Sequence, residues 1–300
     1  MMAALLLAAC GHRASTGTDG TDSLTIGTDS TATADSTGLQ TANLVRLKED
    51  TAVSVRVSID WPTADNSPLA KAIRTYICEE MALSPIQEDK PAVKQYADGQ
   101  QAVDVTASQQ YQQLKAMRRE VREEGIADNM QYSYSLQIEK QEETDRYVTY
   151  ITNSEGFTGG AHGFATSTGM TFRKDDGKRI GYKTAFNEET LSYDIKEQTL
   201  FSSNESAQLY AIIKEGVRSY FQEFEEQPIS DAQLKDMLLD VSSVDSIPLP
   251  SYPPTFTAKG LSFVYQQYHI APYAAGMVNF NVPYDKIRPL LTKDARQLLK

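Results

Sequence analysis

The stretch YSYSLQIEKQEETDRYVTYIT, residues 132–152, decides the fold class. Its first part places Tyr, Tyr, Leu and Ile at every second position, which predicts a strand with one buried face. The sequence RYVTYIT supplies a second strand beyond the polar turn Glu142–Asp145, so the two strands form a hairpin. Sequential strands of this kind favour an α+β fold over a doubly wound parallel sheet.

Helices and further strands surround this hairpin. Residues 53–59 alternate β-branched and polar side chains, which predicts a strand. Ser67 and Pro68 then begin an amphipathic helix as its N-cap and first-turn proline. The same patterns predict helices at 108–124, 206–225 and 230–239 (with a capping box of Ser230 and Gln233), strands at 170–172, 180–182, 261–268 and 277–282, and a terminal helical segment that breaks at Pro289.

The N-terminal sequence predicts a lipid anchor. Residues 1–10, MMAALLLAAC, form a short apolar run that ends in small residues and Cys10. This ending resembles a bacterial lipobox, in which a signal peptide is removed and the cysteine is acylated, for example with palmitate. The alternative is a buried helix that begins at Met1, but the polar sequence that follows argues against it.

Residues 11–45 predict a disordered tether, because they are mainly Gly, Ser, Thr, Ala and Asp and offer little apolar surface to bury. Asp-Ser pairs at 22–23, 29–30 and 35–36 resemble the O-glycosylation acceptors of Bacteroidetes envelope proteins, although low complexity alone also produces such pairs. Beyond the tether we expect an α+β ectodomain with mixed and antiparallel sheets and packed amphipathic helices. It would comprise two subdomains, residues 46–160 and 161–300.

The composition excludes several classes of partner. The 29 basic and 40 acidic residues give a net charge of −11, which disfavours nucleic acid and favours a basic partner. After the N-terminus, no segment reaches the roughly 18 uninterrupted apolar residues of a membrane span, so we expect membrane attachment through lipid only. If Cys10 is acylated, Cys78 has no disulfide partner; it lies on an apolar helical stripe, which predicts a buried, inert thiol.

A glycine-rich stretch, FTGGAHGFATSTGMTFRKDDGKRIGY at residues 157–182, is the place to look for catalysis. It lacks the Lys-Ser/Thr pair of a phosphate loop, the order of a dinucleotide fingerprint and the G-x-S-x-G of a nucleophile elbow. The histidines are His12, His162 and His269, and none has the spacing of a metal site. We therefore predict no metal, no cofactor and no catalytic residue.

The glycines of this stretch have a structural interpretation. Gly159, Gly160 and Gly163 permit positive φ or close backbone approach at a bulge or crossover between two strands. His162 would then bond to neighbouring backbone. The alternative is a loop that presents its N–H groups to a ligand.

Two separated motifs carry a resemblance to a family of bacterial envelope domains. FTGGAHGFATSTGMTFRKDDGKRI, residues 157–180, is similar to that family's Y-T-G-G-A-H junction, and FVYQQYHIAPYAAGMVNFNVPY, residues 263–284, is similar to its I-A-P-Y-A-x-G segment and final strands. The family includes the ectodomain of the lysozyme-sensing anti-sigma factor RsiV, a module of PdaC-type peptidoglycan deacetylases, and Bacteroidetes lipoproteins. The resemblance covers roughly residues 50–300 and implies a fold, not an activity.

Departures from the family limit what the resemblance implies. RsiV-type proteins carry an anti-sigma segment with a membrane span, and the deacetylases carry a metal-dependent catalytic domain; we expect neither activity from the sequence given. The family often carries an acidic residue where His269 stands here.

These features together predict a non-enzymatic, lipid-anchored binding ectodomain in the bacterial cell envelope, on the periplasmic face of the outer or inner membrane. Its ligand would be a basic protein such as a lysozyme, or a cell-wall glycan. The alternatives are a weak peptidoglycan or glycan hydrolase built on carboxylates such as Asp175, Asp176 or Asp285, and a spacer without a ligand. Tyrosine favours recognition surfaces, so a ligand-binding site is expected at Gly159, Gly160, His162, Tyr268, His269 and Tyr273.

Overall fold

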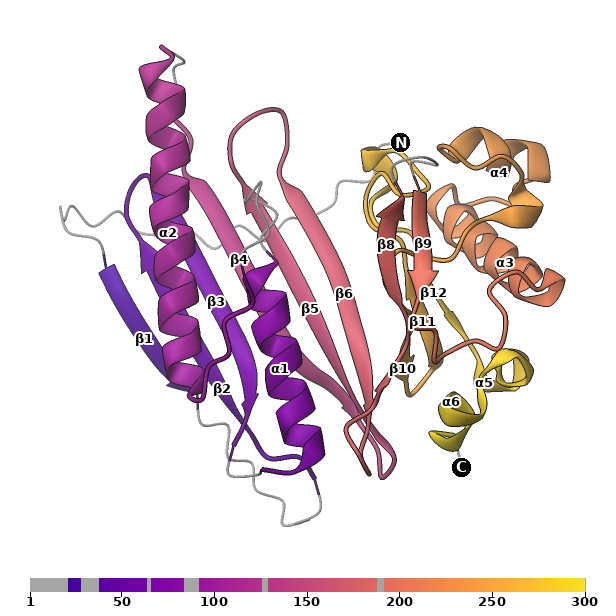
Figure 1. Ribbon diagram of the computed structural model, residues 1–300. Coiled ribbons are helices and arrows are strands. Elements are labelled where there is room, and N and C mark those ends of the chain that lie inside the picture. Colours follow the sequence, from indigo (N-terminus) through magenta and orange to yellow (C-terminus); the bar gives the residue numbers. More distant parts are fainter. Residues whose placement is uncertain are drawn as a thin grey trace.

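The computed structural model describes residues 21–27, 38–63, 66–83, 92–125, 129–187 and 192–299. Within these residues, helices α1 to α6 accompany one mixed sheet and two small antiparallel sheets (Figure 1). This confirms the α+β prediction. Cys10, His12 and two of the three Asp-Ser pairs lie outside the described residues.

The large sheet has its strands in sequence order, from β1 to β7. Strands β3 and β4 are parallel, and every other neighbouring pair is antiparallel. The alternating residues of β3 and β4 and the predicted hairpin of β4 and β5 are confirmed. The strands are β1 (Thr21–Gly27), β2 (Thr41–Glu49), β3 (Val53–Pro62), β4 (Tyr132–Glu143), β5 (Tyr147–Phe157), β6 (Phe164–Arg173) and β7 (Arg179–Ile180).

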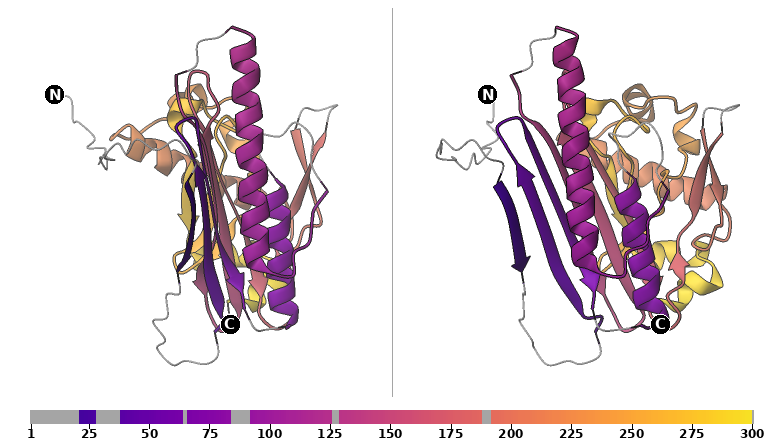
Figure 2. Two further views of the ribbon diagram at one scale, coloured as in Figure 1. Left: turned by 90° about the vertical axis from the view of Figure 1, so that its left-hand side faces the viewer. Right: turned by 60° about the vertical axis from the view of Figure 1, so that its left-hand side comes forward.

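Helices α1 (Pro68–Ala82) and α2 (Gly99–Glu123) connect the parallel strands β3 and β4 and lie on one face of the sheet (Figure 2). Ser67 caps α1 as predicted, because its side chain accepts a hydrogen bond from the N–H of Ala70. Helix α2 begins nine residues before the expected residue 108, with Asp98 as its N-cap.

Small residues let α2 approach the sheet closely. A Cβ on Gly99 would lie 2.5 Å from Cγ of Trp61, so only glycine fits there. The buried face of α2 continues through Ala102, Thr106 and Gln110 to Leu114. Apolar residues at helical spacing in this part of the chain, Tyr111, Leu114, Met117 and Val121, do not form the buried face, because of these only Leu114 is buried.

The predicted tether, residues 11–45, is corrected where the structure describes it. Strand β1 lies inside that range and pairs with β2, which itself begins at Thr41. The low apolar content of this segment predicted disorder. Backbone hydrogen bonds to a neighbouring strand, however, also stabilise a strand that has few apolar side chains. Val45 is buried, so folded structure extends before the expected start at residue 46. Residues 11–20 and 28–37 lie outside the described residues.

The C-terminal elements form a lobe beside β6 (Figure 1). The helix predicted at 206–225, the capping box of Ser230 and Gln233 and the break at Pro289 are confirmed, and Ser206 is the N-cap of that helix. The β8–β9 hairpin and β10 were not predicted. The predicted strands 261–268 and 277–282 are shorter in the structure. The elements are β8 (Lys183–Asn187), β9 (Ser192–Lys196), α3 (Ala207–Phe224), α4 (Asp231–Met237), β10 (Thr255–Thr257), β11 (Gly260–Val264), β12 (Asn279–Val282), α5 (Tyr284–Ile287) and α6 (Lys293–Gln297).

Two buried clusters define an N-terminal lobe, residues 38–173, and a C-terminal lobe, residues 179–299, although Tyr147 of β5 packs into the C-terminal cluster. The expected division at residue 160 is wrong, because β6 pairs with β5 along its whole length and extends the sheet to residue 173. None of the described helices is long and apolar enough to span a bilayer.

A buried hydroxyl pair joins the lobes. The Oγ1 atoms of Thr149 on β5 and Thr171 on β6 lie 2.9 Å apart. Thr149 donates to the carbonyl oxygen of Phe256 on β10 at 2.8 Å, and the N–H of Phe256 donates to Thr171 at 3.1 Å. Both threonines are almost fully buried, so these bonds satisfy backbone groups that water does not reach. We call this arrangement the threonine joint.

Asp50 ties the β2–β3 turn to α2 and gives a first prediction. Its carboxylate accepts bonds from the N–H groups of Ala52 and Val53, from Tyr111 at 2.7 Å and from Lys115 at 2.9 Å. Burial alone would raise the pKa of Asp50, but these hydrogen bonds outweigh it and hold the pKa well below its usual range. Ionised Asp50 therefore stabilises the fold at neutral pH, and this contribution is lost as the pH falls below about 4.

We expect Asp50→Asn to lower the free energy of unfolding by about 2 kcal/mol at pH 7 and by much less at pH 2. Urea unfolding at both pH values measures this. Asp145→Asn, in the exposed β4–β5 turn, is the control and should leave stability unchanged. An equal loss at both pH values for Asp50→Asn would contradict the assignment.

Candidate functional site

Residues 158–163 of the glycine-rich stretch connect β5 and β6. They lie between two strands as predicted, but they form a hairpin turn and not a bulge or crossover, because β5 and β6 pair antiparallel. Gly159 and Gly160 have φ of 94° and 85°, in the region that favours glycine. A Cβ on Gly163 would lie 2.5 Å from the carbonyl oxygen of Gly156 on the facing strand. This turn therefore depends on glycine for two reasons, backbone conformation and close strand approach.

The second half of the site is the loop between β11 and β12. It contains Tyr268, which has φ of 65°, and a single 3-10 turn at Tyr273–Ala275. Tyr220 on α3 fastens this loop by donating a hydrogen bond to the carbonyl oxygen of Ala275. The expected strand at 261–268 ends at Val264 because the chain turns back on itself, with the N–H of His269 bonded to the carbonyl oxygen of Gln266.

Gln266 connects this loop to the free edge of β6. Its side-chain amide makes two bonds with the backbone of Ser167: the Ser167 N–H donates at 3.0 Å, and the Gln266 Nε2 donates to the Ser167 carbonyl oxygen at 2.7 Å. β7 pairs with β6 only at residues 171–172, so the amide covers an edge that would otherwise be open. Sequence reasoning missed this role, although two adjacent glutamines directly after a strand were visible.

Three predicted residues meet where the turn and the loop come together. The rings of His162 and Tyr273 stack with centroids 3.9 Å apart and planes inclined by 22°. Tyr268 lies beside both, 6.5 Å from His162 and 5.9 Å from Tyr273. We call His162, Tyr268 and Tyr273 the aromatic cluster. Tyr268 is 56% exposed, so the cluster faces solvent.

Hydrogen bonds fix the histidine in one orientation. The Nδ1 of His162 lies 2.8 Å from the carbonyl oxygen of Gly163, which also accepts a bond from the Tyr273 hydroxyl at 3.1 Å. A carbonyl oxygen only accepts, so Nδ1 carries a proton and donates it to this carbonyl. The Tyr268 hydroxyl lies 3.4 Å from Nε2. The prediction that His162 bonds to neighbouring backbone is confirmed.

His269 is not part of this cluster. Its ring is half-buried and faces Tyr265 and Tyr193, with centroids 5.5 and 6.5 Å away. Burial lowers its pKa, so the neutral form is favoured. Gly159 and Gly160 shape the turn and contribute no side chain. Of the six predicted site residues, the structure thus gathers three.

The carboxylates considered for hydrolysis are held in other roles. Asp176 forms two hydrogen bonds with Arg173, and these bonds are the main cause that lowers the pKa of Asp176 to about 2. Asp294, which sequence reasoning did not single out, lies 3.6 Å from Arg173, and a bond from Lys178 lowers its pKa. Asp175 and Asp285 are exposed, Asp175 in the β6–β7 turn and Asp285 at the start of α5.

Glu80, near the end of α1, is a titratable group that sequence reasoning missed. It is half-buried and accepts a hydrogen bond from Thr168 at 3.0 Å. Burial raises the pKa of its carboxyl to about 6, although bonds from Thr168 and Thr152 act in the opposite direction. Its neighbour Glu79 pairs with Arg179. No group of three His, Cys, Asp or Glu side chains suited to a metal ion occurs in the described part of the chain.

Residues 181–285 match the model of the family DUF3298, described as a protein of unknown function. The match begins after β7 and covers most of the C-terminal lobe, including Tyr268 and Tyr273 but not His162. No curated protein matches the chain.

Two crystal structures of DUF3298 family proteins resemble this chain over most of its length. One, from Bacteroides fragilis NCTC 9343, has a TM-score of 0.58 at 15% identity and covers 86% of this chain and 95% of that one. The other, from Pseudomonas aeruginosa PAO1, has a TM-score of 0.53 at 16% identity and covers 86% and 96%. At this identity the likeness shows the fold, and it extends beyond the segment that matches the family model.

Gly159 and Gly160 allow a matched test of the turn. Both have positive φ, but a Cβ on Gly159 would lie 2.8 Å from the Tyr132 hydroxyl, whereas one on Gly160 would meet open space. We expect Gly160→Ala to lower stability by about 1 kcal/mol through backbone strain alone. Gly159→Ala should cost about 1 to 2 kcal/mol more through the added contact. Chemical denaturation of both variants measures the difference, and equal losses would contradict the turn geometry.

Glu80 gives a pH prediction with the opposite sign to that of Asp50. Its pKa is raised on folding, so the protein is more stable below the unfolded pKa and loses stability as the pH rises through about 6. Glu80→Gln should stabilise the protein at pH 8, by up to about 2 kcal/mol, and change little at pH 4. Thermal melts at the two pH values test this, and a stabilisation that is the same at both would refute it.

Proposed function

We propose that this protein is a lipid-anchored binding domain of the bacterial cell envelope that catalyses no reaction and holds a ligand against the aromatic cluster. Acylation at Cys10 would keep the folded lobes near the membrane, on its periplasmic face. The fold shared with DUF3298 proteins is compatible with this proposal but assigns no ligand.

The conformation of Tyr268 is the observation that carries the proposal. A tyrosine at φ 65° costs about 1 to 2 kcal/mol relative to an ordinary conformation. The Tyr268 ring is 56% exposed, so its burial offsets little of this conformational cost. Its contact with His162 also contributes little, because the two atoms lie 3.4 Å apart. Strain at an exposed aromatic residue is expected where function selects the position of a side chain.

The surroundings of Tyr268 support recognition in preference to catalysis. The His162 ring is stacked on Tyr273 and its Nδ1–H is bonded to Gly163, so it is held in place as part of a surface. Rigid, exposed tyrosines are frequent at the centres of protein interfaces because they offer a large contact area at low entropic cost. The net charge of −11 would increase the association rate of a basic partner.

We take a basic, lysozyme-like protein as the first ligand to test and a cell-wall glycan as the second. Hydrolysis receives less support from the carboxylates: a glycosidase needs an acid whose pKa is raised next to an ionised partner. Asp176 and Asp294 both have lowered pKa values because cations hold them. Glu80 has a raised pKa, but it bonds to Thr168 and its neighbour Glu79 is paired with Arg179.

Titration calorimetry with lysozyme, at low and high salt, tests the proposal. Tyr268→Ala should weaken binding by about 5- to 30-fold, the loss typical of an interface hot spot. The control is Phe224→Ala, because Phe224 at the end of α3 is 57% exposed, and this variant should bind like the parent. High salt should weaken the binding of lysozyme by the parent protein and by both variants.

A sedimentation assay with purified sacculi tests the glycan in the same way. Tyr268→Ala should reduce the bound fraction and Phe224→Ala should not. Absence of binding to both lysozyme and sacculi, or binding that Tyr268→Ala leaves unchanged, would contradict the proposal. Release of sugars or peptides from sacculi would favour the hydrolase instead.

A further inference from the structure

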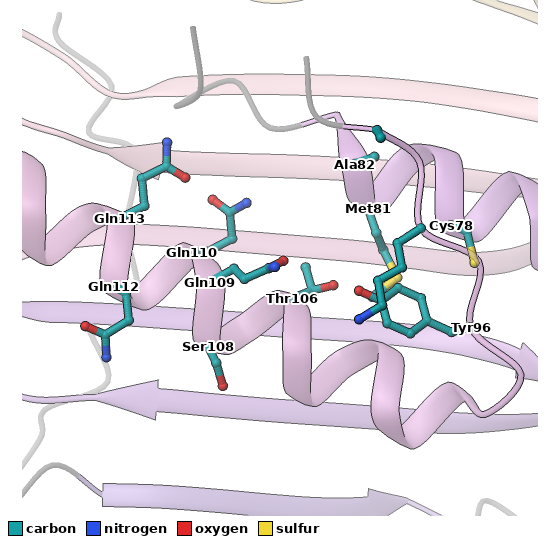
Figure 3. Close-up of a pocket in the computed structure, with 12 residues that line it drawn as sticks. Cys78, Met81, Ala82, Tyr96, Thr106, Ser108, Gln109, Gln110, Gln112 and Gln113 are labelled. Carbon is teal, nitrogen blue, oxygen red and sulfur yellow. The ribbon is translucent and has the colours of Figure 1, made fainter. Parts of the chain in front are cut away.

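A cavity of about 640 Å³ lies on the helix side of the sheet (Figure 3). The residues of the aromatic cluster do not line it. It opens between the end of α1, the extended segment 92–96 and the middle of α2. Its volume is in the range of small-molecule and short-peptide sites.

The floor of the cavity is apolar. Cys78 and Met81 from α1 and the ring of Tyr96 supply it, and all three are buried. Cys78 is the buried thiol that the sequence predicted, and burial raises its pKa, so it acts here as a small apolar surface. Such a floor suits a small apolar side chain.

The wall formed by α2 is made of amides and hydroxyls. Gln109, Gln110 and Thr106 line it, and Gln110 and Thr106 are each only 4% exposed. Figure 3 shows Gln109 extending toward the floor residues, while Gln112 points away from them. An amide side chain both donates and accepts, which is what a peptide group requires of its partners.

One formal charge lies at the mouth, that of Lys94, among the described residues that line the cavity. Its Nζ lies 5.0 Å from the centre of the Tyr96 ring, and the residue is exposed. A single ammonium beside neutral amides favours a ligand with one negative charge. A sugar is less suited, because Tyr96 is 9% exposed and Lys94 lies over its face, so the ring offers no stacking platform.

We propose that this cavity binds the carboxyl-terminal end of a short peptide whose last residue is small and apolar. The terminal carboxylate pairs with Lys94, the peptide groups bond to Gln109 and its neighbours on α2, and the last side chain enters the floor of Cys78 and Met81. This site does not depend on the aromatic cluster, so either assignment can fail without the other.

The test is titration of the full chain with N-acetyl-Ala-Ala, followed by NMR or calorimetry, beside the same dipeptide as its C-terminal amide. The free acid should bind, and removing the carboxylate charge should weaken binding by about three- to fivefold, the value of one exposed ion pair. Lys94→Met should weaken binding of the acid by the same factor and leave the amide unaffected. Lys71→Met, an exposed lysine of α1 that does not line the cavity, is the control and should bind like the parent.

Gln109→Ala is a second variant at an exposed position and should weaken both peptides equally. The proposal is overturned if neither peptide binds, if acid and amide bind equally well, or if Lys94→Met binds the acid like the parent. Binding of an N-acetylglucosamine oligomer in preference to the dipeptide would also overturn it, because the cavity would then be a glycan site.

Discussion

The threonine joint is the constraint on which the arrangement of the two lobes depends. Deep inside the protein, Thr149 bonds to the backbone carbonyl of Phe256, and Thr171 bonds to its N–H. Leaving either backbone group without a partner there would cost about 1 to 3 kcal/mol. A shift of β10 by one residue would break both bonds and bury unpaired groups. The joint thus gives the C-terminal lobe one register on β5 and β6.

The position of the aromatic cluster follows from this register. His162 comes from the β5–β6 turn, whereas Tyr268 and Tyr273 come from the β11–β12 loop of the other lobe. Gln266 makes a similar connection at the edge of β6, because its side-chain amide bonds to both the N–H and the carbonyl of Ser167. The side chains of the cluster are therefore already held in place, so a ligand that binds there loses little free energy to ordering them.

The sequence predicted the elements whose signals are local. The alternation in β3 and β4, the N-cap at Ser67, the capping box at Ser230 and the turn glycines all act within a few residues, and all are confirmed. The start of α2 was missed because its buried face is made of Gly, Ala, Thr and Gln, which apolar periodicity does not detect.

Elements stabilised by distant partners were also missed. Strands β1 and β2 depend on sheet pairing, and the division between the lobes depends on β6 joining β5. For the site, the sequence predicted that His162, Tyr268 and Tyr273 belong together, but it placed His269 with them. The positive φ of Tyr268 turns adjacent side chains in different directions, and no local pattern reveals that.

The most direct test of this account is the NMR shift of the His162 ring protons in the intact protein. Stacking at 3.9 Å on Tyr273 places them in the shielding region of the tyrosine ring. We predict upfield shifts that Tyr273→Leu abolishes, and that a joint variant, Thr149→Val with Thr171→Val, reduces while the N-terminal lobe stays folded. Shifts of a free imidazole in the parent, or upfield shifts that survive loss of Tyr273, would contradict the claim that lobe docking assembles the cluster.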